Sequence, residues 1–341
     1  MGVDRINKID AFRRIKDCCA AASAPKCKSK YTIHFSLFTI HFLFLFALPA
    51  FSQQEEKELA VAFTGDILLD RGVRLQIEER GIESLFSPGM DSLLQSMDYV
   101  VGNLECPATK VKSPVFKRFV FRGEPEWLDA LRRHGFTHLN LANNHTVDQG
   151  RRGLMSTVEN VRKAGMTPFG ADSTLAAATQ PVLLSNTPRK VFLLSSVPIP
   201  LEHFPFLTDR PMPSVLSVDS LISRIRNLKS EHPGCCVIVS LHWGREHTLQ
   251  PTLNQRHDAH RLAAAGADAL VCHHPHTLQT VEHYHGVPIY YSIGNYIFDL
   301  TSDINRRGAV VILRIGKDSV DATSFPYTLQ RCTPILDSPV R

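Results

Sequence analysis

Residues 269–276 read Ala-Leu-Val-Cys-His-His-Pro-His, a short apolar run that ends at once in three imidazoles. An apolar run of this length that stops at polar residues is typical of a buried strand. Three histidines within four residues, stiffened by Pro275, are costly to place without a role, and imidazole is a common metal ligand. We interpret residues 273–276, the histidine loop, as a metal-binding loop at the end of a strand.

The same arrangement occurs four more times along the chain. Apolar runs lead directly into polar side chains able to bind metal at Ala60–Asp66, Tyr99–Glu105, Leu139–His145 and Val237–His242. Each of these alone is more often a turn, a solvated acid or a buried histidine that packs in the core. In an α/β sheet, however, ligands bind beyond the carboxyl ends of the strands. The five runs together therefore predict a cluster of oxygen and nitrogen donors at one sheet edge.

Helical patterns alternate with the apolar runs, which predicts the α/β class. The expected strands are Ala60–Phe63, Tyr99–Val101, His138–Leu141, Val191–Ser195, Val237–Leu241, Ala269–Val271 and Ile289–Tyr291, and the expected helices are Pro125–His134, Gly153–Ala164, Val218–Ser230 and Leu253–Ala265. Three of the helices stop at glycine, a usual helix terminator. We expect one domain over residues 57–335, with the Pro-rich segment 197–213 as a lid or a partial boundary.

The first 52 residues have the features of an export signal. Residues 1–30 are basic, residues 31–52 carry no charged side chain, and the segment ends in the small-x-small sequence Ala50-Phe51-Ser52. This pattern predicts a Sec-type signal peptide. The uncharged run is also long enough for a membrane anchor. Both alternatives place the rest of the chain outside the cytoplasm, in the periplasm or the extracellular space, and the second adds membrane association.

Charge and cysteine content exclude two classes of protein. Residues 1–52 hold 8 of the 38 Lys and Arg and 3 of the 33 Asp and Glu, so the remainder carries 30 of each sign. A charge-balanced body gives no support for nucleic-acid binding. Outside the leader the five cysteines are odd in number and lack CxxC spacing, so at most two disulfides could form and no disulfide framework is legible.

The order of these motifs resembles the bacterial capsule-synthesis family (CapA, or poly-γ-glutamate capsule), which is similar to the calcineurin-like metallophosphoesterases. The matching motifs are Gly65-Asp66, Gly102-Asn103-Leu104-Glu105, Ala142-Asn143-Asn144-His145 with Asp148, His242-Trp243-Gly244-Arg245-Glu246, His273-His274-Pro275-His276 and Tyr291-Ser292-Ile293-Gly294-Asn295. The resemblance runs from about Ala60 to Asp299. It implies a four-layer α/β/β/α sandwich of the metallophosphoesterase type, with a metal site at one sheet edge.

The resemblance also implies roles for individual residues. The implied metal ligands are Asp66, Glu105 as the bridging carboxylate, Asn144, His242, His274 and His276. His145 falls where the superfamily keeps its general acid, and Asp148 is close enough in sequence to orient it. Glu246 and Asn295 are expected to hold ligand imidazoles in their tautomers.

This chain departs from the superfamily pattern at three positions. Leu68 replaces the histidine that usually follows the first aspartate by two residues, so Asp70 or a water would have to substitute. Glu105 stands in place of the usual bridging aspartate. Cys272 replaces the glycine before the histidine loop, and its thiol either packs in the strand or binds metal.

The ligand chemistry narrows the choice of cofactor. Mixed carboxylate, amide and imidazole ligands suit Mn, Fe or Zn better than Ca or Mg, so we expect one or two such ions. Lys117, Arg118 and Arg122 surround Phe116–Phe121, where charge either protects a strand edge or recognises an anionic substrate. For the latter interpretation Lys117 and Arg122 are the expected substrate-binding residues.

Three functions remain open from the sequence. The first is an exported metal-dependent hydrolase of the phosphoesterase type that serves capsule or envelope-polymer synthesis. The second is a non-catalytic component that binds or exports an anionic polymer such as poly-γ-glutamate. The third is a hydrolase of γ-glutamyl amide bonds. Fold resemblance alone does not choose among them, because different chemistries are found on one fold.

Overall fold

The computed structural model describes residues 58–338. The leader, residues 1–52, lies outside them, so its assignment as signal peptide or anchor stays a prediction, as does the extent of the domain. Within residues 58–338, none of the helices has both the length and the apolar content needed to span a bilayer.

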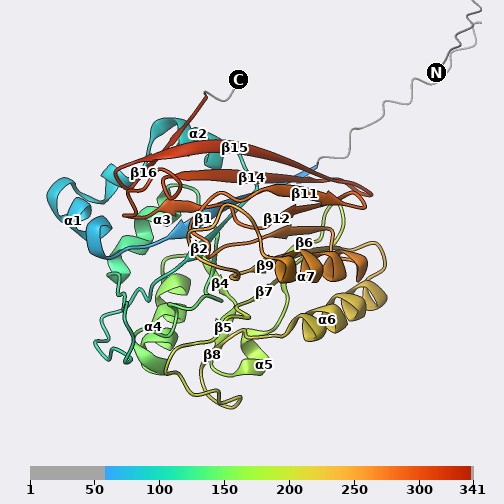
Figure 1. The fold of residues 1–341 in the computed structure, drawn as a ribbon, viewed down its shortest axis with the longest axis horizontal. Helices are drawn as coiled ribbons and strands as arrows, with labels where there is room; N and C mark the ends of the chain where they lie inside the picture. The colour runs from blue at the N-terminus through green and yellow to red at the C-terminus, as the bar shows by residue number, and fades with distance from the viewer. Residues whose placement is uncertain (1–57, 339–341) are drawn as a thin grey trace, which may run out of the picture. The chain divides into compact units, whose positions relative to one another are not determined.

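Two mixed sheets form the centre of the fold (Figure 1). The first has the order β16-β15-β14-β1-β2-β3-β4, and β13 pairs with β1 beside this path. Its strands are β1 (Leu59–Ile67), β2 (Tyr99–Leu104), β3 (His138–Asn140), β4 (Thr167–Phe169), β13 (Asn295–Ile297), β14 (Arg307–Ile315), β15 (Val320–Gln330) and β16 (Thr333–Leu336). Strands β1 to β4 are parallel to one another, and β14 to β16 extend the sheet antiparallel.

The second sheet has the order β11-β12-β10-β9-β7-β6. Its strands are β6 (Val182–Ser185), β7 (Val191–Ser196), β9 (Cys236–Leu241), β10 (Ala269–Val271), β11 (Val281–Tyr284) and β12 (Val287–Tyr290), and a separate pair consists of β5 (Ala171–Asp172) and β8 (Met212–Pro213). The central strands β7, β9, β10 and β12 run parallel. All seven predicted strands are therefore present.

The helices lie between the strands in sequence. They are α1 (Arg71–Arg80), α2 (Pro88–Gln95), α3 (Leu128–Arg133), α4 (Gly150–Lys163), α5 (Leu175–Ala178), α6 (Val218–Glu231) and α7 (Leu253–Ala264), with 3₁₀ turns at Ile82–Leu85 and Pro125–Trp127. The four predicted helices are confirmed, the first as a 3₁₀ turn that continues into α3. A capping box at the start of α7, formed by Thr252 and Gln255, fixes where that helix begins.

Alternate side chains of the strands pack into different cores, which defines the layers. Val61 and Phe63 of β1 face Ile238 and Val271 of the second sheet, in a core between the two sheets. Ala62 instead packs in a core with the side chains of α2, α3 and α4. On the far side of the second sheet a third core includes side chains of α6 and α7. The predicted four-layer α/β/β/α sandwich is confirmed.

The prediction that the polar loops share one sheet edge needs correction. Strands β1, β2 and β3 belong to the first sheet, whereas β9 and β10 belong to the second. Because the two sheets pack face to face, the carboxyl ends of both sets meet at the same end of the sandwich. A contact of 3.1 Å between His273 Nε2 and the Thr64 carbonyl oxygen joins the sheets there.

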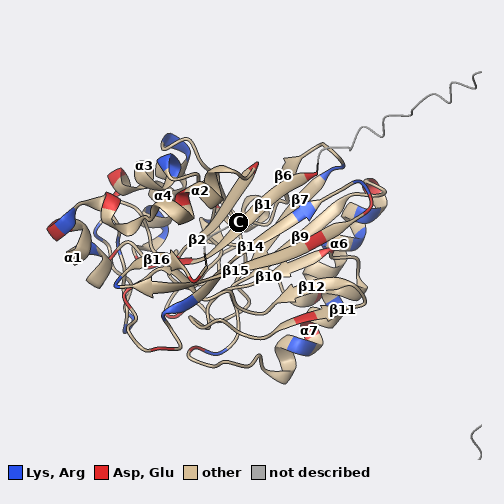
Figure 2. Cartoon of the chain, turned by 90° about the horizontal axis from the view of Figure 1, so that it is seen from above, with Lys and Arg blue, Asp and Glu red and all other residues tan. Residues whose placement is uncertain are grey.

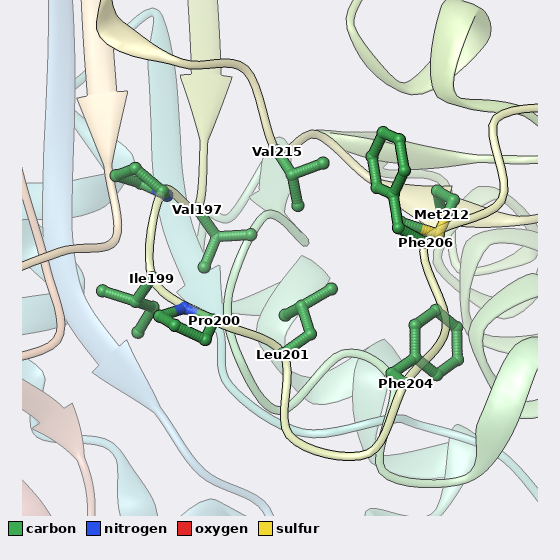
Figure 3. A pocket seen from close by; sticks show the side chains of 9 residues that line it. Val197, Ile199, Pro200, Leu201, Phe204, Phe206, Met212 and Val215 are labelled. Atoms are coloured by element: carbon green, nitrogen blue, oxygen red, sulfur yellow. The ribbon is translucent and has the colours of Figure 1, made fainter.

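The Pro-rich loop that follows β7 packs against elements from the first half of the chain. Arg151 of α4 donates to the Pro205 carbonyl oxygen at 2.6 Å, and its guanidinium lies 4.4 Å from the centre of the Phe204 ring. The loop encloses an apolar pocket of about 400 Å³ (Figure 3), lined by Val197, Pro198, Ile199, Pro200, Leu201, Phe204, Phe206, Met212 and Val215. The loop is thus in contact with α4, and its role as a lid or a partial boundary stays a prediction.

Charged side chains of both signs are spread over the helices and strand ends. Figure 2 shows Lys and Arg interspersed with Asp and Glu in the view from above. This distribution agrees with the charge balance found outside the leader.

Candidate metal centre

Two glycines bring β1 and β13 into close contact. A Cβ atom on Gly65 would lie 2.1 Å from the Gly294 carbonyl oxygen, and Gly294 itself has a φ of +76°. Glycine is suited to both positions, because it lacks a Cβ and tolerates positive φ. The Asp66 amide donates to the Gly294 carbonyl at 3.0 Å, so Asp66 and Asn295 become neighbours in the sheet.

Asp66 is held by a buried chain of amides. Asn103 Nδ2 donates to Asp66 Oδ1 at 2.8 Å, and Asn103 Oδ1 accepts from Asn140 Nδ2 at 3.1 Å. Nδ1 of His242 lies 3.2 Å from Asn103 Nδ2. Hydrogen bonds at both ends of the Asn103 amide fix its orientation. Asn103 had no predicted role, although its position two residues before Glu105 in the second motif was a signal.

Glu105 is the least satisfied polar group at this site. Its side chain is fully buried, and neither carboxylate oxygen has a hydrogen-bond partner among the described residues. Oε1 lies 3.5 Å from His242 Nε2 and 3.6 Å from His276 Nε2. Burial raises the pKa of Glu105 well above its ordinary value. A cation bound here would provide the missing partner.

Two further predicted ligands meet at His242. Its Nε2 lies 2.9 Å from Asn144 Oδ1 and 3.1 Å from His274 Nδ1. Burial lowers the pKa of His242 well below its ordinary value, and burial together with the nearby His276 lowers that of His274 to about 4. Both imidazoles are therefore neutral at pH 7, the form that binds metal.

His276 lies among oxygen acceptors, unlike the other two imidazoles. Its Nδ1 lies 2.9 Å from Asn295 Oδ1 and 3.3 Å from Asp66 Oδ2. Burial alone would lower the pKa of His276, but the Glu105 and Asp66 carboxylates outweigh it and raise the pKa to about 10. The free ring is therefore protonated at pH 7, and a cation bound here would displace that proton. Asn295 contacts this predicted ligand imidazole.

The third imidazole of the histidine loop contacts the backbone of β1. His273 Nε2 lies near the Thr64 carbonyl oxygen, and Nδ1 is buried with no hydrogen-bond partner in the described part of the chain. Burial lowers the pKa of His273. His273 therefore links the sheets, while His274 and His276 point to the cluster, and both of these adopt positive φ, +98° and +55°.

The residues present fit a divalent cation. Among the described residues, three groups place one ligand atom per residue within 4.8 Å of one another: Glu105 with His242 and His274, Asp66 with Glu105 and His276, and Glu246 with His274 and His276. Glu105 belongs to the first two groups, as expected of a bridging carboxylate. The Glu105 oxygens, which have no hydrogen-bond partner among the described residues, are the observation that supports a bound ion, because a buried polar group needs a partner.

His145 and Asp148 form a pair beside these groups. His145 Nδ1 lies 2.8 Å from Asp148 Oδ2, and Phe121 stacks on the imidazole with 4.1 Å between ring centres. Nδ1 therefore donates to the carboxylate, which leaves Nε2 as the atom that accepts or releases a proton. Burial lowers the pKa of His145, although Asp148 opposes this change.

Lys117, in the loop before α3, contacts the Asp148 carboxylate. Its Nζ lies 2.7 Å from Asp148 Oδ1 and 3.0 Å from the Asn144 carbonyl oxygen, and its side chain is 5% exposed. Lys117 is thus engaged with protein groups next to His145. Its predicted role in substrate binding stays a prediction.

Other candidates have contacts of their own outside the three groups. Arg122 pairs with Glu124 at 2.7 Å and donates to the Thr109 carbonyl oxygen, and its role in substrate binding stays a prediction. The Leu68 side chain is buried in the core beside the helices, and burial raises the pKa of the Cys272 thiol to about 12, which favours packing over metal binding. Both oxygens of Asp70 accept hydrogen bonds, from Arg74 and from the Arg122 amide, and Asp70 is in none of the three groups, so its substitution for the missing histidine stays a prediction.

Comparison with known protein families shows which family this chain resembles. The profile described as "Bacterial capsule synthesis protein PGA_cap" matches residues 60–300. The chain belongs to this family. Its matched region contains every predicted site residue.

Curated relatives carry related names. A protein of Bacillus subtilis named "PGA biosynthesis protein CapA" is 29% identical over 305 residues, which cover 87% of this chain and 80% of the relative. A "Capsule biosynthesis protein CapA" of Bacillus anthracis is also 29% identical, over 74% of this chain and 63% of its own length. A "Probable polyglutamine synthesis accessory protein" of Mycobacterium tuberculosis is 31% identical over 50% of this chain and 47% of its own length.

Solved structures show more distant similarity. A phosphatase from Mycoplasma pneumoniae has a TM-score of 0.48 and 12% identity, over 80% of this chain and 94% of that chain. The NAD nucleotidase of Haemophilus influenzae has a TM-score of 0.48 and 10% identity, over 81% of this chain and 57% of that chain.

Proposed function

We propose that this protein is an exported, metal-dependent hydrolase of the phosphoesterase type that acts in capsule or cell-envelope polymer synthesis. The buried carboxylate of Glu105, which lies between His242 and His276 and has no hydrogen-bond partner among the described residues, is the single observation that carries the proposal. Family membership supports the role in capsule synthesis. Poly-γ-glutamate is the polymer expected from the family resemblance.

The ligand set favours Mn, Fe or Zn. Two carboxylates, an amide and three imidazoles are available from Asp66, Glu105, Asn144, His242, His274 and His276. A divalent ion bound by them would neutralise charge on a phosphoryl group and lower the pKa of a bound water to about 7. Asn103 and Asn295 keep these ligands in place through their hydrogen bonds.

His145 is the proton donor in this proposal. Asp148 holds Nδ1–H, so Nε2 is the atom that carries a proton to the leaving group. In the free protein burial lowers the pKa of His145, so the neutral ring predominates at pH 7. An anionic phosphoryl group nearby raises that pKa, because opposite charges favour the protonated ring. The imidazole would therefore take up its proton as substrate binds.

Hydrolysis assays with matched variants test the proposal. The chain is purified without chelators, supplied with Mn²⁺, and assayed on a nitrophenyl phosphomonoester and a nitrophenyl phosphodiester. His242→Ala should lose the activity, whereas His257→Ala, at an exposed histidine of α7, should retain it. Equal residual activity in the two variants would contradict the proposal.

Two further experiments distinguish the other two functions from phosphoester hydrolysis. If poly-γ-glutamate is the substrate, mass spectrometry after incubation will show shorter chains, which indicates γ-glutamyl amide hydrolysis. If a deletion strain lacking capsule is restored by the His242→Ala protein, the site is not catalytic. The names of the curated relatives specify biosynthesis rather than hydrolysis, which is why the second outcome is tested.

A further inference from the structure

An ion held by only one of the three ligand groups would have too few protein ligands. Asp66, Glu105 and His276 form a group of three ligand atoms. Zinc in proteins usually takes four ligands, and Mn and Fe sites commonly take more. At least one further ligand is therefore needed, from the protein or from solvent.

The neighbouring residues of β1 do not supply this ligand. Leu68 is apolar and packs in the core. Asp70 accepts hydrogen bonds at both oxygens, from Arg74 Nε at 3.0 Å and from the Arg122 amide at 2.8 Å. Within the described chain, Glu246 is the one additional residue grouped with the site imidazoles, together with His274 and His276.

Backbone hydrogen bonds fix the position of Glu246. After β9 the chain turns at Gly244, where φ is +97° and a Cβ would lie 2.4 Å from the Gln255 side chain. The Trp243 amide donates to the His273 carbonyl at 3.0 Å, and the His247 amide donates to the Pro275 carbonyl at 2.8 Å. Two bonds to the histidine loop on either side of Glu246 hold it beside that loop.

Within residues 58–338 the Glu246 carboxylate has no close hydrogen-bond partner. His247 Nε2 lies 3.7 Å from Glu246 Oε2, beyond hydrogen-bond distance. The ring of His247 is held by Asn305, whose Nδ2 lies 3.0 Å from Nδ1. The Glu246 side chain is 46% exposed, whereas Glu105 is fully buried. The Glu105 carboxylate thus approaches the imidazoles from the interior, and the Glu246 carboxylate approaches them from the solvent side.

We propose that the Glu246 carboxylate is a ligand of the metal centre from its solvent side, beside His274 and His276. The inference deepens the proposed function, since it depends on a metal being bound. It changes the expected role of Glu246 from orienting an imidazole to binding the ion directly. With Asp66, Glu105 and Glu246 the centre would hold three carboxylates, and carboxylate ligands suit Mn²⁺ better than softer metals.

Mn²⁺ binding tests the inference without an activity assay. Calorimetric titration with Mn²⁺ compares the wild-type chain, Glu246→Gln, Glu246→Asp and a control, Glu231→Gln, at an exposed glutamate that ends α6. Loss of a ligand should weaken Mn²⁺ binding at least about tenfold in Glu246→Gln. Glu246→Asp, which keeps a carboxylate, should bind more tightly than Glu246→Gln, and Glu231→Gln should match the wild type.

Measuring Mn²⁺ binding at high salt distinguishes a metal ligand from a nearby charge that only attracts the ion. At about 1 M salt the Debye length falls to about 3 Å, so a long-range effect of an exposed charge largely disappears. A lost ligand leaves its defect at high salt, and a defect that vanishes there overturns the inference. Wild-type affinity in Glu246→Gln overturns it as well. If the wild-type chain itself binds no Mn²⁺, the proposed function fails instead, so the two failures are distinguishable.

Discussion

Asn103 Nδ2 lies 2.8 Å from Asp66 Oδ1 and connects the first predicted metal ligand to the second strand of the sheet. The same nitrogen faces Nδ1 of His242, across the interface between the two sheets. A neutral amide therefore orients an acid from β1 and an imidazole that follows β9. Such partners of metal ligands strongly affect metal affinity.

Replacing Asn103 by leucine should weaken both folding and metal binding. Each polar group left buried without a partner costs about 1–3 kcal/mol, so the free energy of unfolding should fall by at least that amount. Metal affinity should fall about 10- to 100-fold. Urea unfolding and Mn²⁺ titration measure the two effects, with Asn227→Leu at an exposed position of α6 as control. Similar values for both variants would contradict the role given to Asn103.

The pKa of His145 should respond in opposite directions to its two charged neighbours. Asp148 opposes the lowering effect of burial, and Lys117 adds to that effect. Asp148→Asn should therefore lower the pKa of His145 further, whereas Lys117→Gln should raise it. NMR titration of the imidazole protons measures both shifts. Arg122→Gln is the control, since that guanidinium pairs with Glu124, and a comparable shift in this variant would show that the assignment is wrong.

Gly65→Ala should separate β1 from β13. The added Cβ would lie 2.1 Å from a backbone oxygen of Gly294, so the strands must move apart. Overpacking of this kind costs about 1–3 kcal/mol, and Asp66 would be displaced with the strand. Gly89→Ala in α2, with its nearest neighbouring atom 3.8 Å away, should leave stability equal or slightly higher. Thermal unfolding compares the two, and equal melting temperatures would contradict this account of the Gly65 motif.

Folding stability should fall in mild acid through His138. Burial lowers the pKa of this β3 histidine to about 4, against an unfolded value near 6.5. The unfolded chain then binds more protons between these values, so stability is lost as pH falls. Between pH 7 and pH 5 the loss from one such group is about 2 kcal/mol. His138→Gln should show a smaller decrease over this range in urea unfolding, and an unchanged decrease would contradict the assignment.

The sequence predicted those elements whose signals are local. Short apolar runs ending in polar residues located β1, β9 and β10, and glycine marked the ends of α4 and α7. The antiparallel strands β14 to β16 were not predicted, because their pairing depends on contacts with β1 that are distant in sequence. For the same reason the residues did not show by themselves that the five loops come from two sheets.

The candidate site was predictable to a similar extent. Asp66, Glu105, His242, His274 and His276 could be selected because acids and imidazoles follow strands directly, and the structure brings them together. Asn103 was not selected, because its place in the second motif does not reveal that its amide contacts both Asp66 and His242. The separation of His273 from the other imidazoles depends on backbone φ values of the histidine loop, which sequence spacing does not reveal.

Anomalous diffraction from crystals grown with Mn²⁺ would show whether these residues hold a metal ion. We expect an anomalous peak about 2 Å from the Glu105 carboxylate, within reach of His242 or His276 nitrogen atoms. A Glu105 side chain with only water or protein atoms beside it, and no anomalous peak at the cluster, would contradict the claim that these residues hold a metal.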